Sequence, residues 1–442
     1  KSGYKTATAS VSVTTNEASV KQMNVVAGVD TGISFNPAST GYGETPVGNV
    51  SGKTITVTGS GLSSSITVTN SDNTNFWVKE TPLPATGGTL NITYKPQSKG
   101  SHSTTITCKS GDKVATCVVT GTASNPVPTF TEGWNFSEKN AKKAAWMENW
   151  TNYRNMAFGN GKLYVVDAAK GVVKVINAQT AAHIKDLNMT GVSGGALAIV
   201  DVAYVDGKIV GTGIATKGDD TAKATLKAYV WDNDDAAPRC ILNTTNLGGM
   251  DRVGDAIEVE GNLTTGKLVY LGQQSRSYTT ATGTTATGNC NSLITYAITN
   301  GTVATTPVKA DVDNYIVGLS PRAIPMGGGE YWAVGQNYRP RIINGSGDVV
   351  MDLKTDALQS VQGNDIVSFK FKGDDYAFAT EYDPGTSGDT QSMLKNGRAA
   401  LISGAAGWAD ATRKAYYPST GLSSNTRNTT CSSSICVNVN GE

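Results

Sequence analysis

The sequence predicts an all-β protein in which an N-terminal β-sandwich, residues 1–127, is followed by a β-propeller, residues 128–442. Three observations predict this fold. Residues 51–121 alternate between apolar and polar side chains with the period of two that is typical of strands. A hairpin motif recurs after residue 150 at the spacing of propeller blades. Gly supplies 50 of the 442 residues, which suits a chain with many short turns.

Composition and charge exclude several classes of protein. Charged residues make up 17% of the chain and the formal net charge is +1, so nothing favours nucleic acid or an anionic membrane surface as a partner. The longest apolar stretch, Ala196–Ile214, is interrupted by Asp201, Asp206 and Lys208. A transmembrane helix needs roughly 18 or more apolar residues in a row. We therefore expect no transmembrane segment.

In the first region, short strands alternate with turns. Thr54–Thr58 and Ser65–Thr69 each place their apolar side chains on one face, and the turn Gly59–Gly61 separates them. Phe76–Val78 and Leu90–Tyr94 follow, with Pro and Gly between them. Strands this short, with turns at this spacing, are typical of a β-sandwich.

Three stretches of this region carry a family resemblance: GKTITVTGSGL at 52–62, GTLNITYKPQSKGSHSTTIT at 88–107 and VTGTA at 119–123. They resemble the immunoglobulin-like modules of large bacterial surface proteins. The resemblance implies an immunoglobulin-like β-sandwich that serves as a spacer or anchor, and it implies no activity. Residues 124–129, Ser-Asn-Pro-Val-Pro-Thr, are typical of a semi-rigid linker to the next domain.

Two of the six cysteines are placed so that they could pair. A hairpin folded about residues 112 and 113 would put Cys108 opposite Cys117, with Cα atoms ~4.5–5.5 Å apart, and a disulfide accepts that separation. We therefore expect a Cys108–Cys117 disulfide and an oxidising compartment, with two buried free thiols as the alternative. The sequence does not determine how the other four pair: Cys240, Cys290, Cys431 and Cys436.

The second region is built from a recurring unit: a short apolar strand, a turn with glycine and a second apolar strand. The shorter spacings between the turns match a four-stranded blade of roughly 40–50 residues, and the longer ones carry insertions such as residues 279–289. Six copies predict a six-bladed β-propeller. The turn glycines lie 45 to 68 residues apart, at Gly161, Gly207, Gly266, Gly328, Gly373 and Gly441.

A third strand follows several of these hairpins, as in Val172–Asn177, Leu226–Trp231 and Leu293–Ile298. The run LYVVDAAKGVVKVINAQT at 163–180 resembles the blades of NHL-type and lactonase-like propellers. The two-part arrangement also resembles uncharacterised secreted or lipid-anchored surface proteins of gut-dwelling Gram-negative anaerobes. This resemblance implies an exported protein.

The sixth copy is incomplete, because Val437–Glu442 supplies only a strand and a turn. Residues 128–137 could supply its outer strand, as propellers commonly close. The remaining strands would come from a longer natural chain or from another chain by strand addition. The sequence begins at Lys1 without a signal peptide, which fits a mature exported protein and leaves open a lipid anchor upstream of Lys1.

The chain carries no familiar catalytic motif. It lacks a Gly-x-Ser-x-Gly elbow, a His-Glu-x-x-His helix, a P-loop and a dinucleotide fingerprint. Its two histidines, His102 and His183, fall in different predicted domains, so neither a His-based triad nor a zinc site is expected. We expect no cofactor. The acidic loops 219–220, 232–235 and 311–313 could hold calcium, although solvated turns are the simpler explanation.

Charged residues open the innermost strand of five repeat units. Because that strand lines the central channel of a propeller, we expect these side chains to converge at one mouth. One interpretation is a site for a sugar, a carboxylate or a cation. The other is a ring of Arg–Asp pairs that neutralises itself. The five residues are Arg154, Asp201, Asp255, Arg322 and Asp365.

Several aromatic residues lie near predicted loops or strand ends, where they could stack on sugar rings. Trp332 and Tyr338 are added to the candidate ligand site on this ground, with packing between blades as the alternative. We expect an extracellular, surface or periplasmic protein that binds a glycan or a partner protein at the channel mouth without catalysis. A hydrolase or lyase using the channel carboxylates and a structural subunit of an extracellular assembly are the alternatives. The ligand and the oligomeric state are not determined by the sequence.

Overall fold

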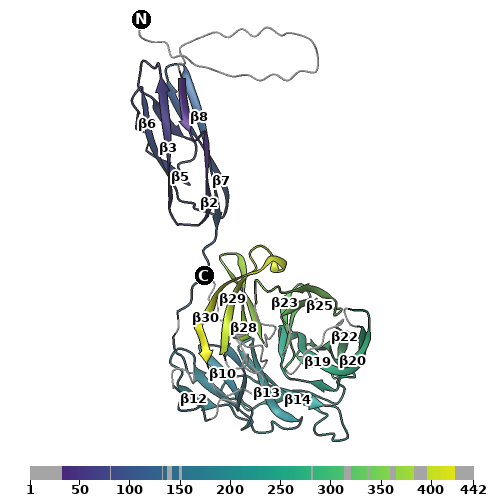
Figure 1. The fold of residues 1–442 in the computed structure, drawn as a ribbon. Helices are drawn as coiled ribbons and strands as arrows, with labels where there is room; N and C mark the ends of the chain where they lie inside the picture. The colour runs from purple at the N-terminus through teal and green to yellow at the C-terminus, as the bar shows by residue number, and fades with distance from the viewer. Residues whose placement is uncertain are drawn as a thin grey trace, which may run out of the picture. The chain divides into compact units, whose positions relative to one another are not determined.

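The computed structural model is all-β, which confirms the predicted fold class. Its described helical part is a single 3-10 turn, Trp408–Asp410, and none of its described helices could span a membrane. The chain forms two compact units, Lys1–Pro128 and Thr129–Glu442 (Figure 1). The structure describes residues 32–79, 81–131, 133–136, 142–148, 152–279, 282–312, 320–335, 339–358, 365–382 and 396–423.

The first unit is a sandwich of two four-stranded sheets. Their inner faces enclose a core that includes Ile55, Phe76, Tyr94 and Val119. Alternation along each strand buries one face and exposes the other, as in β3. One sheet has the order β1 (Gly32–Asn36), β3 (Ser51–Ser60), β6 (Gly87–Tyr94), β5 (Phe76–Val78). The other has the order β2 (Ser39–Pro46), β8 (Lys113–Ser124), β7 (Gly100–Ser110), β4 (Thr67–Asn70).

Strands that are neighbours in the sequence are not always neighbours in a sheet. The predicted strands Thr54–Thr58 and Ser65–Thr69 correspond to β3 and β4, which lie in opposite sheets. The chain crosses the sandwich between them, and β3 pairs with β1 and β6 instead. Both strands bury one face, so their alternation is the same whichever sheet they join.

The predicted Cys108–Cys117 disulfide is wrong in this structure, where both residues are buried free thiols. The hairpin β7–β8 turns about Gly111, whose φ is 56°, so Ser110 pairs with Lys113. This two-residue turn shifts the register by two residues from the predicted one. Cys108 therefore faces Ala115, and Cys117 faces Ile106. Diagonal neighbours lie about 7–8 Å apart, beyond the usual reach of a disulfide.

The second unit contains five described blades of antiparallel strands, of which blades 2 and 3 are joined into one ten-stranded sheet by the pairing of β14 with β17. Blade 1 holds β9 (Tyr153–Gly159), β10 (Lys162–Asp167), β11 (Val172–Asn177) and β12 (His183–Asp186). Blade 2 holds β13 (Leu197–Val205), β14 (Lys208–Thr216), β15 (Leu226–Trp231) and β16 (Arg239–Thr244). Blade 3 holds β17 (Arg252–Val253), β18 (Glu258–Gly261), β19 (Thr265–Thr279), β20 (Thr285–Thr299), β21 (Thr302–Val303) and β22 (Val308–Asp311).

Blades 4 and 5 repeat the four-stranded plan. Blade 4 holds β23 (Arg322–Gly327), β24 (Glu330–Val334), β25 (Arg341–Asn344) and β26 (Val349–Asp352). Blade 5 holds β27 (Ile366–Phe371), β28 (Asp374–Tyr382), β29 (Asn396–Ser403) and β30 (Thr412–Ser423). The sixth predicted copy, Val437–Glu442, lies outside the described residues.

Successive blades pack face to face through separate apolar cores, as in a propeller. Blade 1 packs against blade 2 through Tyr164 and Trp231, and blade 2 against blade 3 through Val230 and Tyr270. Two further cores join blades 3, 4 and 5. The first strands of successive blades lie against one another: β9 contacts β13, β13 contacts β18, β18 contacts β23 and β23 contacts β27. The core of this unit is therefore divided among the interfaces between blades.

The segment before blade 1 contacts both the first and the last described blades. Phe130 packs edge-on against Phe378 and Tyr417 of blade 5. Farther along, the indole N–H groups of Trp134 and Trp146 donate to carbonyl oxygens in the turn between β11 and β12. Phe130 therefore packs on blade 5, and Trp134 and Trp146 are held by blade 1.

We predict that Gly159→Ala destabilises the propeller by about 1–3 kcal/mol. A Cβ at this last residue of β9 would lie 2.2 Å from a ring carbon of Tyr204. That ring stacks on Tyr164 at 5.7 Å, so it must leave its partner in the interface between blades 1 and 2. Urea unfolding measures the loss. Gly218→Ala is the matched control, because its Cβ would meet nothing within 4 Å. Equal stability of the two variants would contradict the prediction.

Candidate functional site

The five charged residues that open the inner strands meet in the channel. Arg154 of blade 1 reaches across to Asp255 of blade 3 at 3.5 Å. Arg322 of blade 4 contacts Asp201 of blade 2 at 3.1 Å and Asp365 of blade 5 at 3.7 Å. Arg154 and Arg322 lie at the start of β9 and β23, and Asp365 lies just before β27. Asp201 lies within β13, and Asp255 lies in the break between β17 and β18. The contacts of Arg154 with Asp255 and of Arg322 with Asp201 therefore join blades that are not neighbours, whereas the contact with Asp365 joins the neighbouring blades 4 and 5.

Each of the three aspartates is held by an arginine and is almost fully buried. Asp201, Asp255 and Asp365 are 0%, 1% and 1% exposed. Asp255 is bound most tightly, because Arg252 donates from Nε at 2.6 Å and from Nη2 at 2.5 Å to its two oxygens. Such a two-pronged contact is among the strongest ionic hydrogen bonds that proteins form.

Three channel residues were not predicted from the sequence: Glu258, Arg252 and Ser320. Glu258 accepts a hydrogen bond from Arg322 at 2.9 Å, and the Ser320 hydroxyl lies 3.4 Å from Arg154. A signal for Glu258 and Arg252 was present, since both lie three residues from Asp255. In blade 3 the inner strand is split into β17 and β18. Blade 3 therefore directs three charged residues, Arg252, Asp255 and Glu258, toward the axis, whereas the other described blades direct one each.

The channel is richer in carboxylates than in cations. Asp201, Glu258 and Asp365 share the single guanidinium of Arg322. Burial raises the pKa of Asp201 to about 6, against the opposing effect of Arg322. Burial likewise raises the pKa of Glu258 to about 8, and the charges of Asp201 and Asp365 raise it further. This raised pKa favours the protonated, uncharged form of Glu258 near neutral pH.

This arrangement limits what the channel can do chemically. A retaining or inverting glycosidase needs one ionised and one protonated carboxyl that both reach the substrate. Here the carboxylates are paired with arginines, and Arg154 and Arg322 have side chains only 8% exposed. The geometry fits the self-neutralising ring better than an open ligand site. Ligand binding by these five residues stays a prediction.

Two aromatic residues were also assigned to the site. Trp332 is instead fully buried in the core between blades 4 and 5, where its ring lies edge-on to Trp408 at 5.0 Å. Its assignment to a ligand is therefore corrected to packing between blades. The sequence of β24 does not show this difference, because the strand is buried on both faces from Tyr331 to Val334. Tyr338 lies outside the described residues.

The acidic loop 232–235 contacts lysines. Asp232 pairs with Lys208 at 2.5 Å, and Asp235 pairs with Lys185. Among the residues that the structure describes, no group of three or more His, Cys, Asp or Glu side chains is placed to hold a metal ion. Calcium binding at the acidic loops stays an untested prediction.

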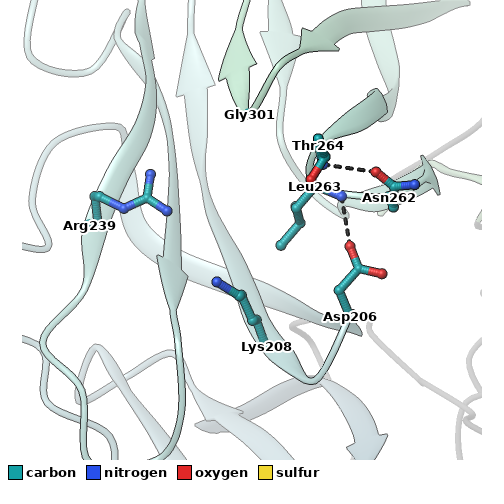
Figure 2. A pocket seen from close by; sticks show the side chains of 7 residues that line it. All are labelled: Asp206, Lys208, Arg239, Asn262, Leu263, Thr264 and Gly301. Atoms are coloured by element: carbon teal, nitrogen blue, oxygen red, sulfur yellow. Dashed lines mark hydrogen bonds between the residues drawn. The ribbon is translucent and has the colours of Figure 1, made fainter.

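An open pocket of about 490 Å³ lies between blades 2 and 3, at the ends formed by their turns (Figure 2). Blade 2 contributes the β13–β14 turn and the first residue of β16. Blade 3 contributes the β18–β19 turn and the turn after β20. We call this the inter-blade pocket. Its lining residues are Asp206, Lys208, Arg239, Asn262, Leu263, Thr264 and Gly301. None of them was predicted from the sequence.

Neither a protein-family model nor a curated protein matches the chain. Among solved structures, a DUF4623 family protein from Bacteroides eggerthii is 12% identical, with a TM-score of 0.46, over 76% of this chain and 71% of that one. A quinoprotein alcohol dehydrogenase-like protein from Bacteroides thetaiotaomicron is 10% identical, with a TM-score of 0.36, over 88% of this chain and 96% of that one. Both scores are below 0.5, so the fold is assigned from the strand pairing described above.

We predict that Arg322→Met destabilises the protein by about 3–5 kcal/mol, because Asp201 and Asp365 lose their shared cation and Glu258 loses its hydrogen-bond donor. Thermal unfolding at pH 7 measures the loss. At pH 5 the defect should shrink, since Asp201, whose pKa is raised to about 6, becomes protonated. Arg322→Lys, which keeps the charge but not the planar fork, should fall between wild type and Arg322→Met. A defect that is independent of pH would contradict this account.

The raised pKa of Glu258 also predicts how stability depends on pH. Between its ordinary pKa of 4.5 and its folded value of about 8, the folded state binds more protons than the unfolded state. Stability should therefore fall as pH rises through this window. Glu258→Gln keeps a group that can accept from Arg322 and removes the titration. We expect this variant to exceed wild type by about 1–3 kcal/mol at pH 9 and to match it at pH 5. Denaturant unfolding at both pH values tests this.

Proposed function

We propose that this chain is an exported, non-catalytic binding protein of the cell surface or periplasm, in which the propeller holds the ligand. The observation that carries the proposal is the pairing of Asp201, Asp255 and Asp365 with arginines. This pairing supports a structural role for the channel, in which its charges join the blades. The ligand would then be recognised at another surface of the propeller.

The rival function, a hydrolase or lyase using channel carboxylates, would require a carboxylate that is free to meet a substrate. The arginine contacts and the near-zero exposure of the three aspartates weigh against it. The proposed location rests on the stretches in the sandwich that resemble modules of bacterial surface proteins. In such an arrangement the sandwich serves as a spacer that carries the binding domain.

A glycan array probed with the full chain tests the proposal. We expect retention of one or a few glycans, and we expect the same glycans to be recovered intact after prolonged incubation, as judged by mass spectrometry. Glu258→Gln is the matched channel variant, because it removes an ionisable group from the channel and should leave glycan binding unchanged. Cleavage of a retained glycan, or loss of binding in Glu258→Gln, would contradict the proposal.

A further inference from the structure

The inter-blade pocket is the open, polar cavity that the proposed function requires. Its volume of about 490 Å³ falls in the range of small-molecule sites, roughly 300–1,000 Å³. It is built on turns that are fixed by hydrogen bonds. The Asn262 side-chain oxygen accepts from the backbone N–H groups of Thr264 and Thr265, and the Gly301 N–H donates to the Thr264 carbonyl. The pocket is therefore formed before any ligand arrives.

Two cations reach this pocket from blade 2. The Arg239 side chain, exposed at the start of β16, makes no hydrogen bond or ion pair to any described residue. The pKa of the nearby Asp232 carboxyl is nevertheless lowered by its hydrogen bond from Lys208 and also by the charge of Arg239. Lys208 lines the same pocket (Figure 2). It also contacts Asp232 at 2.5 Å. An unpaired guanidinium offers a planar fork of donors that fits a carboxylate with two parallel hydrogen bonds. The cations of the pocket thus favour an anionic group with carboxylate geometry.

The rest of the pocket presents groups suited to hydroxyls. Asp206 accepts the Leu263 N–H at 2.8 Å through one oxygen, and its exposed carboxylate has further acceptor capacity. The Asn262 amide group and the Thr264 hydroxyl add donors and acceptors on the facing turn of blade 3. The carboxylate of Asp206 would repel a multiply charged phosphate, whereas it accepts from neutral hydroxyls.

We propose that the inter-blade pocket binds a saccharide bearing a carboxylate, with Arg239 and Lys208 holding the carboxylate and Asp206 and Asn262 holding ring hydroxyls. This inference rests on the proposed function and names its ligand class. It assigns ligand binding to the inter-blade pocket, which none of the channel residues lines. The two charges would select an acidic saccharide over other ligands. A neutral sugar would offer no anion to Arg239, and a simple anion would offer no hydroxyl to Asp206.

Calorimetric titration of the full chain with three probes tests the inference: trigalacturonate, a mannuronate trimer and sialyllactose. At least one should bind, and its methyl ester should bind at least tenfold more weakly. Arg239→Ala should weaken binding of the acid about 10- to 100-fold, as expected for loss of a charged hydrogen-bond pair. Arg239→Lys should recover part of that loss. Lys370→Ala is the control, because this exposed lysine lies in the β27–β28 hairpin of blade 5, outside the pocket. This variant should bind the acid as tightly as wild type does.

Three outcomes would overturn the inference. The first is equal binding of an acid and its ester, and the second is unchanged binding by Arg239→Ala. The third is full competition by acetate at the concentration of the saccharide, which would indicate a site for simple carboxylates. If the array detects neutral glycans while all three acidic probes fail, this inference is wrong and the proposed function stands. If a probe is cleaved, the proposed function is wrong.

Discussion

The contact on which the propeller most depends is that of Arg322 with carboxylates from three other blades. One guanidinium in blade 4 touches Asp201 in blade 2, Glu258 in blade 3 and Asp365 in blade 5. A buried charge is costly unless it is paired, so any rotation of one blade that separated these groups would be strongly unfavourable. The contact of Arg154 with Asp255 ties blade 1 to the same cluster. Apolar packing attracts neighbouring blades, whereas the ionic cluster fixes their angular positions about the axis.

This closure of the channel has a functional consequence. Charges that satisfy each other across the axis offer a ligand little free energy, because a ligand must first replace contacts that are already made. The inter-blade pocket differs, since the exposed Arg239 side chain makes no hydrogen bond or ion pair to a described residue. Stable blades thus supply rigid turns, and the turns carry the groups available for recognition. This division between scaffold and loops is common in folds built from repeats.

Several features of the fold and site could be predicted from the sequence because they follow from local patterns. Period-two alternation locates strands such as β3 and β10, and the recurring turn glycines mark the inner hairpins. Placing the opening residue of each hairpin on a common axis predicts that Arg154 and Asp255 lie close together, and the two form an ion pair. The wrong disulfide prediction and the failure to predict Glu258 have equally local causes. The turn at Gly111 shifted the β7–β8 register by two, which separates Cys108 from Cys117. The split inner strand of blade 3 added Glu258 to the channel.

The sequence by itself determined the all-β class, the repeat of the hairpins and the identity of the charges at the axis, because strand periodicity and turn chemistry act over a few residues. The tertiary structure alone decided which strands share a sheet, that Trp332 is buried, and that Lys208 and Asn262 line one pocket. These features depend on contacts between residues far apart in the chain. A buried face looks the same in the sequence whatever covers it, and a surface turn gives no sign of which turn of the next blade will lie beside it.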